Sequence, residues 1–376
     1  EQTQMKQKIK IGNFEAFCLL INMFCTKIIL DFPRNVAEDA GTAAWIMVLL
    51  VSVTVFVVFI VIAKIYKDFS NKDILDVAES GIGEAGKIIA GLLFMFQFLY
   101  LIPIILREFA EDIKVISLTT TPISIIITLF CIGMITGAFI GIETLARINA
   151  LSVPILAAAF MLILLLSIPR FDSSKIAPWL GPGPVTIIKE AVPNISAYSE
   201  LTVLLFIMPF LNEKANYVGI GKYAILVTGF FFTFSTLTYM LVYQYPMATE
   251  FFLPIYQLAR SIGIGRFLSR IEAIFILVWA SSAFLYLSSG LYFVTYLFKK
   301  SFGLKTEKPL LIPFTILIFS IAMIPENLYS ALRLEMSLYR NYAWIIMIII
   351  PLFLLITASV RTKSERRNKS NEAGNE

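Results

Sequence analysis

The sequence of 376 residues contains no histidine and only three cysteines. Without histidine, Ser–His and Cys–His catalysis are excluded, and the commonest metal ligand and proton shuttle of proteins is missing. Cys18, Cys25 and Cys131 all lie in apolar stretches, which indicates neither a disulfide framework nor a CxxC metal site. We therefore expect no enzyme activity, no bound metal and no cofactor.

Charge is also scarce. Charged residues make up 15% of the chain and hydrophobic residues 58%, whereas a soluble domain has roughly 25% and 45–50%. The apolar residues form blocks long enough to cross a bilayer, which takes about 20 helical residues. We find no short apolar N-terminal segment with a small-residue cleavage site, and we therefore expect no signal peptide. The net charge of +5 is modest, and in a membrane protein it reflects where lysines and arginines lie on the loops. We therefore expect membrane lipid around the chain and no nucleic-acid partner.

The apolar blocks predict an all-α integral membrane protein with about ten transmembrane helices. We place the spans at residues 12–31, 44–63, 87–106, 120–140, 149–168, 191–211, 221–243, 271–298, 309–325 and 341–360. A tail over residues 1–10 precedes this single transmembrane domain of residues 11–360, and a basic, disordered tail follows over residues 361–376. With the N-terminus inside, most lysines and arginines fall on inner segments, which predicts cytoplasmic termini.

Two spans are interrupted by polar residues and prolines. In the first span, Lys27 is followed by Asp31-Phe32-Pro33-Arg34, and the sixth contains Pro193, Tyr198-Ser199-Glu200 and Pro209. First and sixth are corresponding positions if the fold consists of two halves of five helices in opposite orientations. Paired interruptions of this kind are typical of inverted-repeat transporters and mark their binding site. We therefore predict a five-plus-five inverted repeat with broken helices 1 and 6.

Lys27 and Glu200 are charges inside apolar spans. A charge in mid-membrane costs at least about 2.5–3.5 kcal/mol on insertion scales, so it needs a structural or functional reason. If spans 1 and 6 touch at their breaks, the two can approach and lower the cost of burying both. They would then either bind the ammonium, carboxylate or hydroxyl of a small ligand or form a purely structural ion pair. A further alternative is that Lys27 snorkels outward past Asp31.

The broken helices predict a ligand site. Unwound backbone frees N–H and C=O groups that must be paired in hydrocarbon, and a zwitterionic ligand can pair them. On span 8, Ser282, Tyr286 and Ser289 share one helical face and would complete the pocket; the alternative is hydrogen bonding between helices. The candidate ligand-binding residues are Cys25, Thr26, Lys27, Ile28, Gln97, Tyr100, Tyr198, Ser199, Glu200, Ser282, Tyr286 and Ser289.

Three other segments are interpreted without a ligand role. Glu108, Glu111 and Asp112 follow span 3 and are expected on a solvated outer face. Residues 254–265 are expected to form an interfacial helix, because arginines bracket this stretch. The GxGxxG at residues 81–86 lies in a short loop without a preceding strand, which argues against dinucleotide binding.

Several short motifs follow one another along nearly the whole chain. They are Phe32-Pro33-Arg34 with Trp45, Arg107-Glu108-Phe109-Ala110-Glu111, Thr121-Pro122, Glu143 with Arg147, Pro178-Trp179-Leu180-Gly181, Glu200 with Pro209-Phe210, Phe267-Leu268-Ser269-Arg270-Ile271-Glu272 leading into Val278-Trp279, and Lys300-Ser301-Phe302-Gly303. Their order and spacing resemble the B subunits of spore germinant receptors from endospore-forming bacteria. These subunits are a permease-like branch of the amino acid–polyamine–organocation (APC) superfamily.

The resemblance implies an APC/LeuT-like fold, residence in the spore inner membrane, and assembly with a larger A subunit and a lipoprotein C subunit. It also implies binding of a small-molecule nutrient such as an amino acid, sugar or nucleoside, which triggers germination through the partner subunits. The chain departs from the family at the break in span 1, where Cys25-Thr26-Lys27 replaces small, glycine-rich residues.

The departure suggests that the Lys27 ammonium takes the place of a transported cation or of a ligand's own ammonium. That arrangement would suit a neutral, hydroxyl-rich ligand or a receptor locked against transport. The alternatives are a proton- or cation-coupled amino-acid permease and a structural subunit that needs no ligand.

Overall fold

The apolar blocks form long helices in the computed structural model, which describes residues 10–69, 72–262 and 271–373. The helices of the first half are α1 (Asn13–Ile29), α2 (Phe32–Ala40), α3 (Ala44–Tyr66), α4 (Ile74–Ile82), α5 (Glu84–Ile116), α6 (Ile123–Ile140) and α7 (Ile142–Leu166). The second half contains α8 (Pro184–Asn194), the 3-10 segment η5 (Ile195–Thr202), α9 (Val203–Ile207), α10 (Tyr217–Val242), α11 (Pro254–Ser261), α12 (Ile271–Ser301) and α13 (Leu311–Ala322). The chain ends in α14 (Leu328–Leu334), the π-helical turn η9 (Glu335–Tyr339), α15 (Arg340–Trp344), the π-helical turn η10 (Ile345–Ile349) and α16 (Ile350–Ala373).

The helices account for the predicted spans. Among the described residues, seven helical stretches are long and apolar enough to cross a membrane. The remaining three predicted spans correspond to α1, with 17 residues, α12, with 31, and the shorter apolar helix around α13. α1 is short because its span is broken, which leaves α2 to continue the path.

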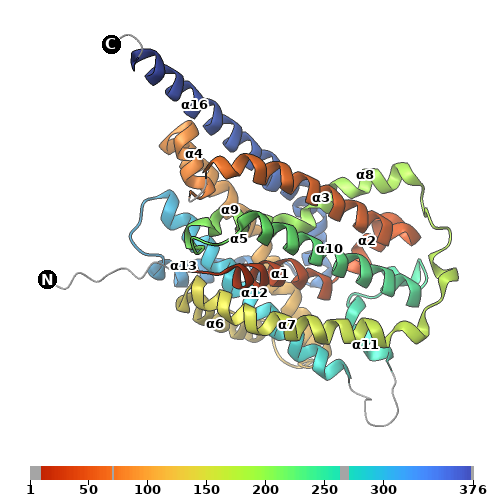
Figure 1. Cartoon of the computed structure of the whole chain (residues 1–376). Helices are drawn as coiled ribbons and strands as arrows, with labels where there is room; N and C mark the ends of the chain where they lie inside the picture. The colour runs from red at the N-terminus through yellow and green to blue at the C-terminus, as the bar shows by residue number, and fades with distance from the viewer. Residues whose placement is uncertain (1–9, 70–71, 263–270, 374–376) are drawn as a thin grey trace.

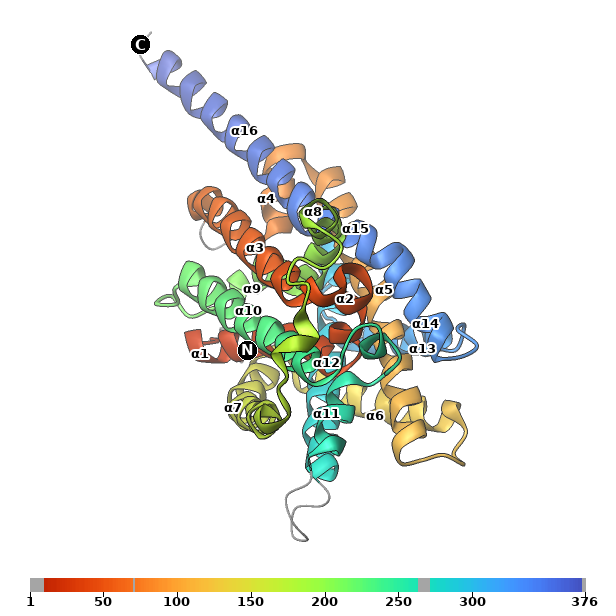
Figure 2. The ribbon, with the colours of Figure 1, turned by 90° about the vertical axis from the view of Figure 1, so that its right-hand side faces the viewer.

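α1 lies at the centre of the bundle. It contacts α7, α10 and α12, and the ribbon shows it between α10 and α7 in the middle of the bundle (Figure 1). Figure 2 views the same ribbon from the side. Most of its side chains are buried, on all sides of the helix. A helix that is apolar all round is typical of such a buried position. A charged side chain near the end of α1 therefore points into protein rather than lipid.

Both predicted helix breaks are present. α1 ends at Ile29, and α2 begins after Asp31 with Pro33 in its first turn, where the missing N–H of proline costs no helical hydrogen bond. In the sixth span, α8 gives way at Asn194 to η5, in which Tyr198 has φ −101° and ψ 16° and leaves the helical conformation. The first and sixth spans are thus discontinuous at corresponding positions, as predicted.

The expected disordered tail is wrong for residues 361–373. α16 continues without interruption to Ala373, and the ribbon shows it projecting beyond the bundle (Figures 1 and 2). Neither proline nor glycine occurs between Leu352 and Ala373, and the lysines, arginines and glutamates there favour helix. Within the predicted helix at residues 254–265, α11 covers Pro254–Ser261. Residues 1–9 of the N-terminal tail and residues 263–270 of the motif before α12 lie outside the described part.

The expected solvated face after span 3 is also wrong. α5 continues past the predicted end at residue 106 to Ile116 and packs against α13 and α14. As a result Glu108 and Asp112 are 1% and 3% exposed. Glu111 pairs with Arg107, with 2.7 Å between Nη2 and Oε1. The charges that suggested the end of a span are therefore inside the protein.

Candidate functional site

The two intramembrane charges meet where the broken helices touch. Lys27 lies in the last turn of α1 and Glu200 in η5. The Lys27 Nζ is 2.8 Å from the Glu200 Oε2, and the two side chains are 7% and 0% exposed. The structure thus brings together two residues that are 173 positions apart in the sequence.

Further donors complete the environment of the Glu200 carboxylate. The Tyr286 hydroxyl of α12 donates to Oε1 at 3.0 Å, and the Ser199 hydroxyl lies 3.3 Å from Oε2. Lys27 also reaches the Ala197 carbonyl and the Ser199 hydroxyl, each at 3.4 Å. A buried ion pair is tolerated when its remaining polar atoms are hydrogen-bonded in this way. The pair is therefore held by α1, η5 and α12 together.

Ser199 links the pair to two more helices. Gln97 of α5 donates from Nε2 to the Ser199 carbonyl at 2.9 Å, and the Ser199 hydroxyl bonds to the Tyr339 hydroxyl. The Tyr339 ring faces the Lys27 ammonium at 5.6 Å and stacks on Tyr100, with 6.0 Å between centroids. The structure thus places Gln97 and Tyr100 of span 3 beside the ion pair, and their role in binding a ligand stays a prediction.

Tyr339 is a site residue that the sequence interpretation missed. It lies in η9, the π-helical turn of the last span, and π-turns are frequent at functional sites. The extra residue of a π-turn changes which side chains face the core. Because nothing in the local sequence marks such a turn, helical spacing alone did not assign Tyr339 to the pocket.

A second group of predicted residues lies on another side of α1. Cys25, Ile28 and Ser282 line a mainly apolar cavity of about 40 Å³ between α1, α7, α10 and α12. The Thr26 and Ser282 hydroxyls are 3.0 Å apart, and Ser282 donates to Asn22 at 2.8 Å. These contacts join α1 to α12 and not to the Lys27–Glu200 pair.

The two remaining predicted residues make other contacts. The Tyr198 hydroxyl is 2.7 Å from the Ser52 hydroxyl of α3, so its polar end points away from Glu200. Ser289 donates at 2.7 Å to the Leu285 carbonyl of its own helix, a local bond common for buried serines. Neither hydroxyl is brought to the ion pair.

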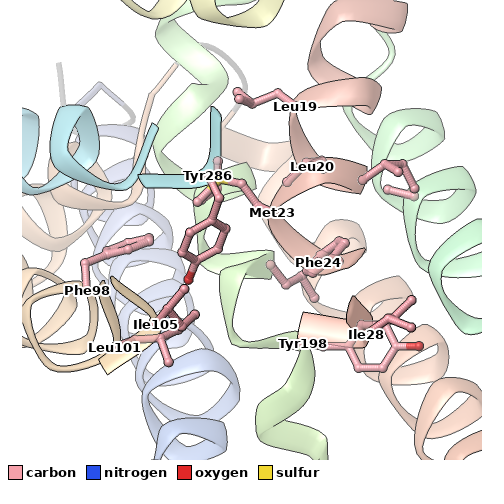
Figure 3. Close-up of a cluster of buried hydrophobic side chains, with 14 of the residues drawn as sticks. Leu19, Leu20, Met23, Phe24, Ile28, Phe98, Leu101, Ile105, Tyr198 and Tyr286 are labelled. Carbon is pink, nitrogen blue, oxygen red and sulfur yellow. The ribbon is translucent and has the colours of Figure 1, made fainter. Parts of the chain in front are cut away.

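Apolar side chains enclose the polar centre. Figure 3 shows Tyr286 between residues of α1, including Met23 and Phe24, and residues of α5, including Phe98 and Leu101. All of these are 2% exposed or less. They keep water from the ion pair and so strengthen its electrostatic interactions.

A small cavity adjoins the pair on the side of α2 and η9. Lys27, Asp31, Asn35, Tyr339 and Arg340 are among its lining residues, and its volume is about 20 Å³. One water molecule needs about 10–15 Å³ measured in this way. The structure is therefore closed around the polar centre, and a larger ligand can enter only if helices separate.

Removing the Tyr286 hydroxyl should weaken this centre. We expect Tyr286→Phe to lower the free energy of unfolding in detergent by about 1.5–3 kcal/mol, the range for hydrogen bonds to charged groups. Tyr292→Phe is the matched control, because Tyr292 is also buried on α12 but is not bonded to Glu200. Equal stability losses for the two variants would contradict a special role for Tyr286.

Solved transporters share this architecture. MhsT in complex with L-phenylalanine superimposes with a TM-score of 0.71 and 13% identity, covering 94% of this chain and 89% of MhsT. A Na⁺-coupled sialic acid symporter in a substrate-bound, outward-open state has a TM-score of 0.67 and 12% identity, covering 91% and 79%. The protein is thus an integral membrane protein with the APC/LeuT-like transporter fold.

Sequence comparison narrows this class. Residues 10–331 match the family model described as "Spore germination protein", and the chain belongs to this family. Spore germination protein KB of Bacillus subtilis (strain 168) is 24% identical over 98% of this chain and 99% of its own length. Spore germination protein A2 of the same organism is 23% identical over 96% and 99%.

Proposed function

We propose that the chain is the nutrient-binding subunit of a spore germinant receptor and that it binds a small molecule at the breaks of α1 and η5. It would reside in the spore inner membrane with both termini in the cytoplasm. It would act with a larger A subunit and a lipoprotein C subunit. The observation that carries the proposal is the buried Lys27–Glu200 pair at the junction of the two broken helices.

The fold supports a ligand at this junction. In this class of fold, substrates bind near the bilayer midplane, where half-helices expose backbone groups. MhsT was solved with L-phenylalanine and the sialic acid symporter with its substrate bound. The same fold therefore accommodates small organic molecules of different polarity.

The residues around the pair favour a neutral ligand with hydroxyl groups. Lys27 already supplies an ammonium, and the ammonium of an amino acid would have to displace it from Glu200. Ser199, Tyr286 and Tyr339 offer hydroxyls that both donate and accept hydrogen bonds. A sugar or nucleoside can exchange hydrogen bonds with these groups without adding charge to a buried site.

The closed cavity supports a receptor mechanism. A volume of about 20 Å³ admits no sugar or nucleoside, so the ligand must bind a more open arrangement of the helices. Preferential binding to that arrangement shifts the population toward it. The partner subunits would sense this shift, and transport of the ligand would not be required.

Germination of spores lacking the gene tests the proposal. We expect loss of the refractility change in response to one class of nutrient, with normal responses to the others. The wild-type gene should restore the response, and the gene carrying Lys27→Met should not. Lys64→Met, a control at an exposed position near the end of α3, should restore it. Normal germination on every nutrient in a strain without other receptors would contradict it, and uptake of a nutrient into proteoliposomes would favour the permease.

A further inference from the structure

Three carboxyl groups from distant parts of the chain converge beside the polar centre. Asp31 lies between α1 and α2, Glu108 on α5, and Glu335 at the start of η9. One oxygen from each lies within 4.8 Å of the other two. Asp31 and Glu108 are 6% and 1% exposed, so this acidic cluster is inside the protein.

The Glu108 carboxylate is unusual among the buried acids of the described residues. Within residues 10–69, 72–262 and 271–373, neither of its buried oxygens accepts a hydrogen bond from an N–H or a protein hydroxyl. Glu335, the group beside it, is another carboxyl. Glu111, one turn further along α5, has Arg107 as its partner. A buried carboxylate without such a partner is costly and must be neutralised by a cation or by a proton.

The neighbouring cations are already engaged. Lys27 pairs with Glu200 at 2.8 Å, and Arg340 pairs through Nη1 with Asp39 at 2.9 Å. Arg107 is taken by Glu111. Asp112, 3% exposed, adds one more buried acid near the cluster. Each of these three cations is therefore paired with a carboxylate outside the cluster.

We propose that Asp31, Glu108 and Glu335 bind a divalent cation and that Ca²⁺ fits the cluster best. Carboxylate oxygens are hard ligands, which Ca²⁺ holds at about 2.3–2.6 Å. Oxygens on opposite sides of the ion are then about 5 Å apart, and the spacing of the cluster, within 4.8 Å, agrees with this. The double charge of the ion offsets two carboxylates at once.

Neutral oxygens nearby can complete the ligand set. Asn35 donates its amide N–H to Asp31, and within the described residues its buried Oδ1 accepts no hydrogen bond. Asp31, Asn35 and Glu335 also line the cavity of about 20 Å³, which has room for one water. Mg²⁺ usually keeps several waters, so this confined space favours Ca²⁺.

The bound ion would join the break in α1 to α5 and to the last span. Lys27 lines the same cavity, so the ion and the ion pair would share one electrostatic environment. Binding of Ca²⁺ would therefore stabilise the closed arrangement of these helices. The residues of this cluster differ from those proposed to contact the nutrient, so the two proposals fail separately.

Calcium titration of the purified full chain in detergent tests the proposal. In buffer freed of divalent ions, calorimetry should show saturable binding of one Ca²⁺ per chain, and added Ca²⁺ should raise the melting temperature. Glu108→Gln should weaken binding at least tenfold and abolish the thermal shift. Glu143→Gln, the same change at an exposed i,i+4 pair on α7, should leave both measurements unchanged.

Two results would overturn the site. The first is the absence of saturable binding up to about 10 mM Ca²⁺, a concentration beyond the range of weak natural Ca²⁺ modules. That result would mean that protons, and not Ca²⁺, hold the cluster together. Binding unchanged in Glu108→Gln would place the ion elsewhere. If Glu108→Gln is not recovered as a monodisperse protein, Glu335→Gln is titrated instead, because this carboxyl is only partly buried and its replacement perturbs packing less.

Discussion

Replacing Lys27 by methionine should lower the free energy of unfolding in detergent by about 3–5 kcal/mol, the usual cost of removing one partner of a buried ion pair. The loss arises because the Glu200 carboxylate, which is fully buried, is left without its cation. The Tyr286 hydroxyl alone cannot replace the ammonium. Chemical unfolding followed by tryptophan fluorescence would measure the change.

The double variant Lys27→Met/Glu200→Gln separates the pair from its parts. Removing both charges leaves no uncompensated ion, so we expect most of the stability lost in Lys27→Met to return. Lys64→Met controls for loss of a lysine at an exposed position. If the double variant is as unstable as the sum of both single variants, the two side chains do not interact. If it regains stability but not the nutrient response, the pair has a role in ligand binding beyond structure.

Asp73→Ala should give the second largest loss, about 2–4 kcal/mol from a helix cap and buried hydrogen bonds. Asp73 is fully buried and caps α4 by accepting the N–H groups of Leu75 and Asp76 at 3.0 Å. It also accepts the Tyr296 hydroxyl at 2.6 Å and pairs with Lys300 of α12. One substitution therefore disconnects the loop helix α4 from the end of α12.

The effect should extend to the C-terminal helix, because α4 packs against α16. Proteolysis would show this as faster cleavage within residues 361–373. Asp68→Ala, the same change at an exposed nearby position, should alter neither stability nor cleavage. A stability loss below about 1 kcal/mol, the value of the cap alone, would show that the bonds to Tyr296 and Lys300 contribute nothing.

Some residues of the polar centre could be singled out from the sequence because burying their charge in hydrocarbon costs free energy. Lys27 and Glu200 are charges inside otherwise apolar spans, and hydrocarbon tolerates such charges only with a partner. The break beside Lys27 is marked by Pro33, which cannot continue α1, whereas Pro193 lies within α8 just before the second break. Desolvation cost and backbone chemistry are local properties, so they predicted the breaks and singled out the two charges. They left open whether the two charges meet.

Other residues were misplaced because their surroundings come from distant segments. Glu108 and Asp112 follow an apolar block and look like the start of a solvated loop. They are buried because α13 and α14 cover this end of α5. Likewise Cys25 and Ile28 are close to Lys27 in sequence, and Ser282 shares a helical face with Tyr286. All three nevertheless line a different cavity. A helix that is buried on all sides has no face that the sequence alone can assign to the site.

The sequence by itself determined the membrane environment, the ten apolar spans, the two interrupted helices and the two intramembrane charges that require a partner. These follow from hydrophobicity, proline and the cost of buried charge, which act over a few residues. Only the tertiary structure decided which side of α1 each neighbour faces, that η9 adds Tyr339 to the centre, and that Asp31, Glu108 and Glu335 converge. Those outcomes depend on how helices far apart in the chain pack, and this packing sets burial and charge proximity.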